Sequence, residues 1–291
     1  MILFAIGIIF LTTGIIQAGF GGGLDTSNDI TYKITINTPH IKDAETDAWV
    51  SLRLNGTNGS GSISLMGAPE ERQRQKPLSK ELNGSRYFTI RHNRLEQGSV
   101  DHASILSKDL GKLTGVLVSH KNTTQKGGWD LSDIVVKPMG IHGGKKVVFP
   151  CHRWISATDD DQKLSRLLEP EGDLVHYIVQ VHTGRKEDAG TDARIRIDMG
   201  GTTNNEISSW QLSCPGNPFE YGKVDTFNIY SKDLGDLQSL RVSQDGTGAD
   251  SNWYLYKIVV NRNVSPEKSW TFYYDQWLDT KNGQSKSAVP E

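Results

Sequence analysis

The sequence of 291 residues contains one pattern twice. Lys-Asp-Leu-Gly occupies 108–111 and again 232–235, and a tryptophan follows each glycine at the same spacing, at Trp129 and Trp253. A shared order of separate landmarks indicates a duplicated domain. Each copy must bury a core of its own, which a chain of this length allows. The further repeated landmarks are Ala-x-Thr-Asp-Ala at 44–48 and 189–193, Ile-Val-Val at 134–136 and 258–260, and Phe149 and Trp154 against Phe272 and Trp277.

The landmarks also set the boundaries of the two copies. The first copy extends from about residue 30 to 158, and the second from about residue 173 to 281. Residues 159–172 predict an acidic linker, because three consecutive aspartates open the segment. Its apolar stretch at 164–168 predicts one helical turn, which ends at Pro170 because proline does not continue a helix.

The two copies differ in length. Equivalent aspartates lie 145 residues apart at Asp47 and Asp192, but 124 residues apart at Asp101 and Asp225. The first copy therefore carries an insertion of 21 residues, placed near 67–84. That stretch is rich in Glu, Arg and Gln, which is typical of an exposed loop.

Short segments of both copies alternate apolar and polar residues with a period of two. Apolar side chains then face one side of a strand and charged ones the other, and clusters of Gly, Asn and Asp bound the segments. We therefore expect an all-β fold of two tandem antiparallel β-sandwiches, in which two sheets bury one face each. Segments with this pattern include 32–36, 49–54, 177–181 and 193–199.

Residues 1–18 predict a signal peptide. Residues 2–16 are almost wholly apolar, and 16–18 offer a small-residue cleavage site after Ala18. The apolar run is shorter than the roughly 20 residues that span a bilayer. A basic residue is missing before the run, so an uncleaved anchor stays an alternative. We expect a secreted, extracellular protein without a transmembrane span in the mature chain.

Asn-x-Ser/Thr sequons agree with an extracellular location. Four of the five lie in the first copy, so glycans there would cover that copy and leave the second more open. The acceptor asparagines are Asn55, Asn58, Asn83, Asn122 and Asn263.

The two cysteines, Cys151 and Cys214, leave two interpretations open. In an oxidising compartment they form one disulfide, which would clamp the copies together because Cys151 closes the first and Cys214 lies inside the second. Alternatively, each is a separate buried thiol that fills space as a small apolar side chain.

The second copy carries a series of motifs in a fixed order: Tyr177-x-Val179-x-Val181, Thr183-Gly184, Ala189-Gly190-Thr191-Asp192-Ala193, Phe219-Glu220-x-Gly222-x-x-Asp225-x-Phe227, Asp233-Leu234-Gly235, Trp253-x-Leu255 and Phe272-x-x-x-x-Trp277-Leu278. In these motifs it resembles the PLAT domain, the β-sandwich of lipoxygenases, pancreatic-type lipases and polycystins. The resemblance covers nearly all of the second copy.

The first copy is similar to the same family but departs from its motifs. The departures are Pro39 for Gly184, Glu45 for Gly190, Leu95 for Phe219, and His102 and Ser104 for Thr226 and Asn228. Together the two copies cover nearly all of the expected mature chain, so the resemblance implies a tandem PLAT protein that is not itself a lipase or lipoxygenase.

The composition and motifs argue against other function classes. A formal net charge of -2 and a pI near 6.5, without a basic stripe, do not indicate nucleic-acid binding. The sequence lacks a Gly-x-Ser-x-Gly nucleophile motif and a His-Glu-x-x-His metal motif. We therefore expect a non-enzymatic protein.

Calcium is the cofactor that fits the loops of the second copy. Ca²⁺ binds roughly six to eight oxygens from carboxylates, amides and main-chain carbonyls. The resemblance implies ligand positions at Asn217 and Glu220, and more weakly at Gly184, Gly190 and Asp245; Asp192 adds a carboxylate from the same set of loops.

Two observations count against a calcium site. Arg185 and Lys186 in the first loop oppose a dication, and Asp and Asn residues commonly just form turns. In the first copy Asn93 and Glu96 persist, but Lys121 occupies the region of Asp245. Calcium binding is therefore expected mainly in the second copy.

Two aromatic residues of the second copy are candidates for contact with a lipid or another partner. Phe219 and Tyr221 lie in the predicted calcium loop, where an exposed ring would enter a headgroup layer. The alternative is that the ring closes the end of the sandwich. The repeated tryptophans and Trp210 are expected in the cores.

These observations lead to one main expectation and its alternatives. The chain is expected to bind a lipid or membrane surface, with calcium bridging phosphate headgroups. The alternatives are a calcium-independent protein–protein interaction adaptor and an extracellular structural component. The partner itself is not named by the sequence.

Overall fold

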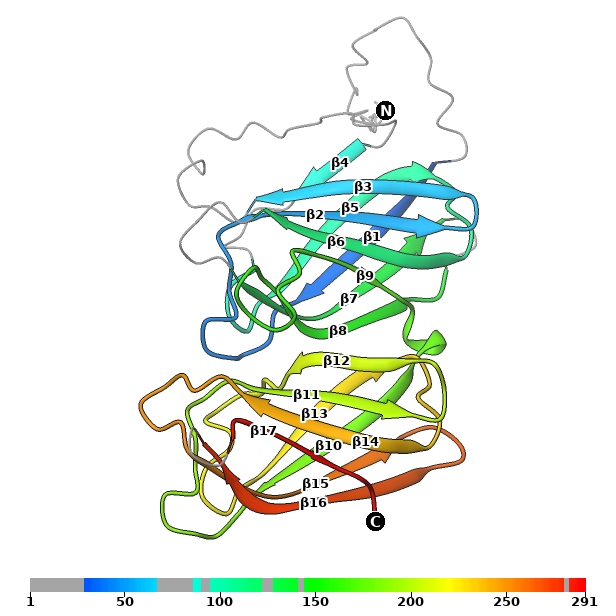
Figure 1. The fold of residues 1–291 in the computed structure, drawn as a ribbon. Coiled ribbons are helices and arrows are strands. Elements are labelled where there is room, and N and C mark those ends of the chain that lie inside the picture. Colours follow the sequence, from blue (N-terminus) through cyan, green and yellow to red (C-terminus); the bar gives the residue numbers. More distant parts are fainter. Residues whose placement is uncertain (1–28, 67–85, 90–94, 122–127, 141–143, 280–282) are drawn as a thin grey trace, which may run out of the picture.

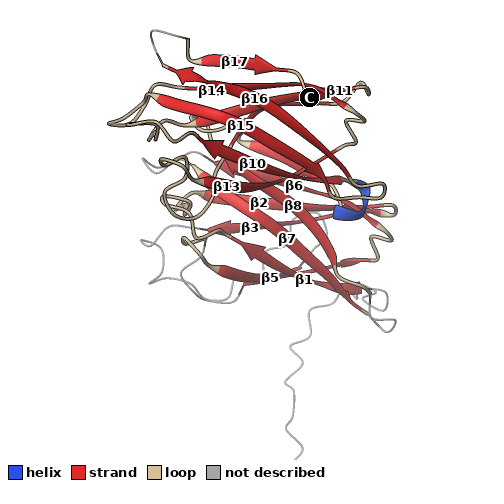
Figure 2. Ribbon diagram, turned by 90° about the horizontal axis from the view of Figure 1, so that it is seen from below, coloured by secondary structure: helices blue, strands red, loops and turns tan. Residues whose placement is uncertain are grey.

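The computed structural model describes residues 29–66, 86–89, 95–121, 128–140, 144–279 and 283–291. In this part the chain forms two β-sandwiches stacked one above the other (Figure 1). Strands make up nearly all of the regular structure, and Figure 2 shows one short helical turn beside the strands. The predicted signal peptide and the insertion near 67–84 lie outside the described residues, as do Asn83 and Asn122.

The first sandwich packs a five-stranded sheet against a four-stranded one. Both sheets are antiparallel, and alternate residues of each strand point into the core between them. The strand orders are β4 (Arg86–Thr89), β5 (Val100–Lys108), β1 (Asp29–Asn37), β7 (Trp129–Met139), β8 (Val147–Ile155), and β3 (Gly59–Met66), β2 (Trp49–Gly56), β6 (Leu113–Lys121), β9 (Ser165–Leu168).

The second sandwich repeats this plan with two four-stranded antiparallel sheets. A 3₁₀ turn, η2 (Glu171–Asp173), precedes it. The predicted all-β fold of two tandem sandwiches is confirmed. The strand orders are β13 (Val224–Ser231), β10 (Val175–Thr183), β15 (Trp253–Arg262), β16 (Lys268–Leu278), and β12 (Glu206–Gln211), β11 (Ile195–Gly201), β14 (Leu237–Gln244), β17 (Ser285–Ala288).

The repeated Lys-Asp-Leu-Gly motif fixes the same turn in both sandwiches. In the second, the Leu234 N–H donates to the Tyr177 hydroxyl (2.9 Å), and the Gly235 N–H donates to Asp233 Oδ1 (2.9 Å). Gly235 has φ +71°, a conformation that favours glycine. In the first, the corresponding bonds join Leu110 to Tyr32 and Gly111 to Asp109, both at 2.8 Å.

The repeated tryptophans lie in the two cores, as expected. Trp129 and Trp253 are both 0% exposed, and a buried indole N–H needs an acceptor. Each donates to a threonine at the end of the neighbouring strand or just beyond it: Trp129 to Thr38 Oγ1 (3.1 Å) and Trp253 to Thr183 Oγ1 (3.0 Å). Trp210 is also buried, at 6% exposure.

The predicted linker is shorter than the sequence suggested. Residues 165–168 are β9, which pairs with β6, and Leu168 belongs to the first core. The predicted helical turn over 164–168 is therefore wrong. Among the described residues, a helical turn, η2, follows Pro170 instead. A four-residue strand is too short for its alternation to be distinguished from a helical turn. The second sandwich extends beyond 281, because β17 pairs with β14.

The remaining part of the expected linker joins the sandwiches through Asp160. Its side chain is 0% exposed and accepts hydrogen bonds from Arg153 (Nε to Oδ2 and Nη2 to Oδ1, both 2.6 Å) and from Arg166 (3.1 Å). On the other side, Asp160 Oδ1 accepts the Gln211 N–H (2.8 Å), and the Asp160 N–H donates to Gln211 Oε1 (2.9 Å). Asp160 thus binds groups of both sandwiches.

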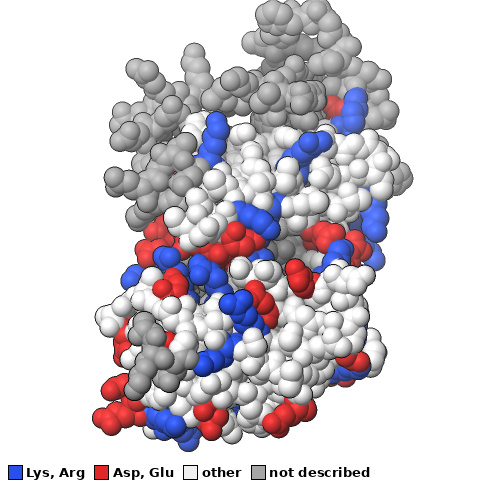
Figure 3. Space-filling model, viewed as in Figure 1, with Lys and Arg blue, Asp and Glu red and all other residues white. Residues whose placement is uncertain are grey.

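Other side chains widen this junction. Arg153 lies over the Trp210 ring, 4.4 Å from its centroid, and Trp154 Nε1 donates to Ser213 Oγ (2.9 Å). Ion pairs at the margins join Asp159 to Arg194 (3.2 Å) and Glu169 to Lys232 (2.9 Å). Acidic and basic side chains form a band between the sandwiches in Figure 3. The two sandwiches are therefore held in one orientation by polar, directional contacts.

Replacing Asp160 with alanine removes the bidentate partner of Arg153, leaves Asp161 as the remaining carboxylate beside Arg153 and Arg166, and removes the Gln211 pair. We expect Asp160→Ala to destabilise the chain by about 3–5 kcal/mol, the range for breaking a buried ion pair. Calorimetry should resolve two transitions where the unmodified chain shows one. Asp173→Ala, at an exposed position of η2, is the control and should leave the profile unchanged. A single unshifted transition in Asp160→Ala would contradict this role.

Candidate functional site

Three loops of the second sandwich meet at one end, which we call the loop end: residues 184–194, 212–223 and 245–252. They are joined by backbone hydrogen bonds. The Thr191 N–H donates to the Phe219 carbonyl (3.3 Å), and the Asp192 N–H donates to the Asp250 carbonyl (2.7 Å). These bonds bring together the loops that carry the predicted calcium ligands.

The repeated Ala-x-Thr-Asp-Ala motif builds the first of these loops. Ala189 is fully buried, and its carbonyl accepts the Tyr254 N–H (3.0 Å). Thr191 Oγ1 accepts the Ala193 N–H (3.1 Å) and donates to the Asp250 carbonyl (3.1 Å). The first sandwich makes the equivalent backbone contact, from the Asp130 N–H to the Ala44 carbonyl (3.1 Å). The motif therefore shapes the loop.

Three of the predicted calcium ligands come together. Asn217 Nδ2 donates to Glu220 Oε1, and Glu220 Oε2 lies 3.2 Å from the position that a Cβ at residue 190 would take. Gly190 thus leaves room for the carboxylate beside its backbone. In the first sandwich Glu45 occupies the equivalent position, so that room is not conserved between the copies.

The side chains of two other predicted ligands, Asp245 and Asp192, make different contacts. Asp245 Oδ1 accepts the N–H groups of Arg194 (3.1 Å) and Thr247 (3.0 Å). Burial acts to raise the pKa of Asp245, but these hydrogen bonds outweigh it, and the pKa lies below its usual value. Asp192 packs against Gly248, where a Cβ would lie 2.4 Å from the Asp192 Cβ.

Gly184 serves packing in this structure. A Cβ at residue 184 would lie 2.3 Å from Tyr254 Cδ1, so only glycine allows this close approach. The Gly184 carbonyl accepts the Gly222 N–H (3.1 Å), which connects two of the three loops. Gly184, a predicted ligand position, is therefore needed for close packing against the Tyr254 ring.

The donor set at the loop end fits a weak oxygen site. Within the described residues, no group of three or more His, Cys, Asp and Glu side chains is arranged to hold a metal. Glu220 and Asn217 supply one carboxylate and one amide, and further oxygens would come from loop carbonyls. Ca²⁺ affinity rises with the number of charged ligands, so a single carboxylate predicts weak binding.

Of the two aromatic contact candidates, one is wrong. Phe219 is 3% exposed, at φ +64°, and its ring packs on Phe227 (5.6 Å between centroids) and Trp253 (5.3 Å). It closes the end of the core, as the alternative stated, because its N–H is held by Asp225 Oδ2 (2.7 Å). Tyr221, two residues later, is 58% exposed and available for contact.

The disulfide interpretation is not supported by the structure, in which both cysteines are free. Cys151 lies in the first core and Cys214 packs against the second. Burial raises the pKa of Cys151 to about 12 and that of Cys214 to about 11, so both thiols stay protonated at neutral pH. They behave as apolar fillers.

Three sequons fall on described residues. Asn58 is exposed in the turn between β2 and β3, and Asn263 is exposed after β15. Asn55, at the end of β2, is half-buried. Glycosylation of these residues stays a prediction.

Comparison with known families agrees with this architecture. The model of the PLAT/LH2 domain matches residues 79–168 and 177–289, one segment in each sandwich. The chain belongs to the PLAT/LH2 family. The first match includes β9, in agreement with its place in the first sandwich, whereas β1, β2 and β3 lie outside it.

Similar proteins carry PLAT domains in larger chains. Lipoxygenase homology domain-containing protein 1 of Mus musculus is 28% identical over 268 residues, covering 89% of this chain and 12% of that protein. Polycystin-1-like protein 3 of Mus musculus is 30% identical over 131 residues, covering 43% and 6%. The chain thus spans 12% or less of the length of these relatives.

A solved structure of coral 8R-lipoxygenase is also similar, with a TM-score of 0.36 and 26% identity over 40% of this chain and 17% of that one. PLAT domains are non-catalytic modules through which proteins contact membranes, lipids or other proteins. Among the described residues, no helix has the length and apolar character needed to cross a membrane.

Phe219 and Tyr221 allow stability and binding to be separated. We expect Phe219→Ala to destabilise the chain by about 3–5 kcal/mol, because it empties a packed site between two aromatic rings. Tyr221→Ala should change stability by less than about 0.5 kcal/mol, as is usual for an exposed side chain. Urea unfolding of both variants measures this difference, and equal losses would contradict the assigned burial.

Proposed function

We propose that this PLAT protein binds anionic membrane surfaces through the loop end of its second sandwich. The observation that carries the proposal is Tyr221, which is 58% exposed in a loop that also carries Lys223 and packs against Arg185 at Gly222. A tyrosine has an apolar ring and a polar hydroxyl, which suits the boundary between headgroups and acyl chains.

The basic side chains come from two of the three loops. Arg185 packs beside Gly222, with its Cγ 3.2 Å from the position a Cβ there would take. Lys223 donates to the Asn217 carbonyl, and Lys186 lies 3.9 Å from the centroid of the Tyr254 ring. All three are exposed, and each basic residue near an anionic surface contributes about 1 kcal/mol to binding.

The arrangement of the sandwiches supports the same proposal. In Figure 1 the loop end of the second sandwich and the 38–48 loop of the first lie on the same side of the stack. A planar surface on that side would meet both sandwiches. Because polar, directional contacts already fix the two sandwiches relative to each other, little further freedom is lost when both bind one surface.

Vesicle binding tests the proposal. We expect Tyr221→Ser to lower the partition coefficient onto vesicles that contain phosphatidylserine several-fold, and Arg185→Glu with Lys186→Glu to lower it by about tenfold or more. Binding of the unmodified chain should fall with increasing salt, because screening weakens the attraction.

The matched controls make the same kinds of substitution outside the loop end. Tyr256→Ser removes a tyrosine that is 41% exposed on β15, and Arg241→Glu reverses a charge on β14. Both should bind vesicles like the unmodified chain. Equal losses in the control and loop-end variants, or unchanged binding in the latter, would contradict the proposal.

We also propose that calcium strengthens this contact through Glu220 and Asn217. A cation there would neutralise the Glu220 carboxylate within the basic surface and could bridge to a phosphate. A donor set with one carboxylate supports weak binding, so the effect is expected at millimolar calcium.

Thermal unfolding with EDTA and then with millimolar calcium measures this site. A ligand at about 100 times its Kd adds roughly 2.7 kcal/mol to the free energy of unfolding, which raises Tm visibly. We expect Glu220→Ala with Asn217→Ala to remove the calcium-dependent rise while keeping the Tm measured in EDTA. A rise of the same size in the double variant would exclude this pair as the ligands.

The proposed location follows from the sequence. The apolar run at 2–16 and the sequons support secretion, with the loop end acting on an extracellular surface. The alternatives are a calcium-independent protein adaptor and an extracellular structural component. They would be favoured if the loop-end variants left vesicle binding unchanged.

A further inference from the structure

The junction between the two sandwiches is an edge-to-edge contact. The first sandwich contributes β8, the edge of its larger sheet, and the loop that leads to β9, the edge of the other. The second contributes β12 and β13, the edges of its two sheets on the facing side. Figure 1 shows this as a head-to-tail stack, with β16 and β17 on the far side of the second sandwich.

The edge formed by β8 and β9 recurs in the second sandwich as β16 and β17. β8 and β16 both carry a bulge in the same place, and His152 and Asp275 there have φ +49° and +46°. Trp154 and Trp277 follow two residues later in each. β9 and β17 pair with the equivalent strands β6 and β14.

The residues that follow these short strands are also equivalent. Pro170 and Glu171 come after β9, and Pro290 and Glu291 come after β17 at the same spacing. The Glu291 N–H donates to the Thr271 carbonyl of β16 (3.0 Å), so this segment crosses from β17 to β16. Glu169, which pairs with Lys232 across the junction, corresponds to Val289.

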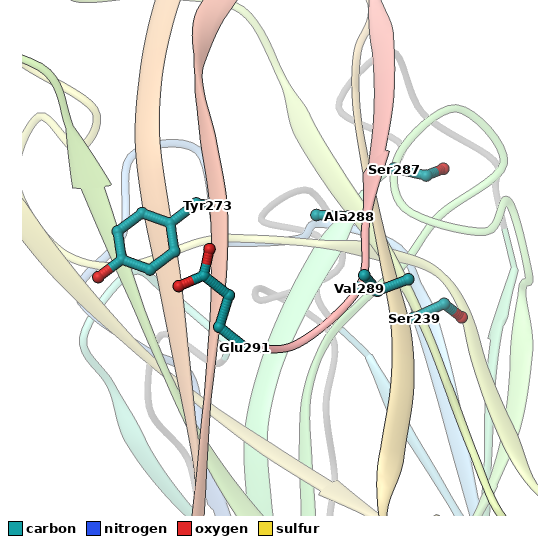
Figure 4. Close-up of a pocket in the computed structure, with 6 residues that line it drawn as sticks. All are labelled: Ser239, Tyr273, Ser287, Ala288, Val289 and Glu291. Atoms are coloured by element: carbon teal, nitrogen blue, oxygen red, sulfur yellow. The ribbon is translucent and has the colours of Figure 1, made fainter.

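The β16/β17 edge is open where its counterpart is covered. Trp154 is 8% exposed beneath the second sandwich, whereas Trp277 is only half-buried. Val289 is 71% exposed and Tyr273 41%. A groove of about 460 Å³ lies here. Its lining residues, Ser239, Tyr273, Ser287, Ala288, Val289 and Glu291, are drawn in Figure 4.

The first sandwich does not present an uncovered edge strand at the position that β13 has in the second. β5 is the strand of the first sandwich equivalent to β13, but β4 pairs along its outer side (Arg86 with Leu106 to Thr89 with Ala103). A paired edge does not offer the surface that β13 offers. A second copy of this chain is therefore a poor partner for the β16/β17 edge.

Charge indicates which kind of edge fits. At the junction, three basic side chains of the second sandwich face the first. Arg194, just before β11, pairs with Asp159; Arg196 of β11 donates to the Asp160 main-chain carbonyl; and Lys232, just after β13, pairs with Glu169. The β16/β17 edge carries Asp275 and Glu291 at the positions of His152 and Glu171. Asp275 stands where the first sandwich has His152, so the β16/β17 edge gains a carboxylate that complements the basic side chains on the β12/β13 side of a sandwich.

We propose that the β16/β17 edge docks a further PLAT sandwich, which presents an uncovered edge of the β12/β13 type, edge to edge as at the junction within this chain. The contact is head-to-tail and does not close, so it extends a stack in one direction. β4 ends the stack on the other side.

The test extends the full chain by a copy of its own residues 172–291, joined directly to Glu291. The copy then follows Pro290-Glu291 as the second sandwich follows Pro170-Glu171. Gln276, equivalent to the junction residue Arg153, is replaced by cysteine in the middle sandwich only, with Cys214 changed to serine throughout. We expect the rate of maleimide labelling at this cysteine to be at least tenfold lower in the extended chain than in the unextended one.

Two controls make the result specific. Glu187→Cys, exposed in the 184–194 loop at the loop end, should label at the same rate in both chains. In the extended chain, Val289→Glu should lower the maleimide labelling rate at Gln276→Cys further, because it restores the acidic partner of Lys232. Val289→Lys should raise this labelling rate, because two lysines repel each other. Equal rates at Gln276→Cys in both chains would overturn the proposal. So would an appended sandwich that fails to fold while the first two remain folded.

Discussion

The arrangement of this molecule depends on a buried carboxylate that belongs to neither core. Asp160 is surrounded by Arg153 and Arg166 from its own sandwich and by the backbone and side chain of Gln211 from the other. Removing a carboxylate from water is costly, and only charged partners and further hydrogen bonds together offset that cost. Asp160 has both, but only while the two sandwiches keep this one relative position. The requirement for full pairing therefore makes the junction specific.

A fixed junction has a consequence for binding. Each loop end offers a small surface, and the one with the exposed tyrosine belongs to the second sandwich. When both loop ends face the same side, weak contacts of each sandwich with one surface reinforce one another, because the second contact forms without a new search. At this junction the two PLAT sandwiches of the chain stack edge to edge without sharing a sheet. A directional stack is consistent with the presence of this unit in much longer relatives.

Much of the fold was accessible from the sequence because the duplication exposes it. Leu234 and Gly235 recur as Leu110 and Gly111 since a tyrosine hydroxyl and an aspartate hold them in the same turn twice. The sequence could not assign β9, because four residues do not separate a strand from a helical turn. It also could not separate Phe219 from Tyr221, since the positive φ that turns Phe219 into the core is a tertiary property.

The junction was the largest feature that the sequence did not reveal. Three consecutive aspartates are typical of an exposed linker, and burial of Asp160 depends on two arginines that only the fold brings near it. The candidate calcium ligands show the same limit. Asn217 and Glu220 are three residues apart and meet through a local turn, whereas the Asp245 carboxylate accepts nearby backbone N–H groups and Asp192 packs against Gly248. The pairing of Asn217 with Glu220 is local and could be predicted, but the sequence could not show that Asp192 and Asp245 make other contacts.

The account rests most directly on the fixed orientation of the sandwiches. Spin labels at Lys42 and Tyr221, both exposed at the loop ends, report the distance between them by pulsed electron paramagnetic resonance, with Cys214 replaced by serine. We expect one narrow distance distribution in the full chain, which broadens in Asp160→Ala. A broad distribution in the chain with Asp160 intact would show that the sandwiches move independently, and it would contradict both the shared binding side and the stacking geometry.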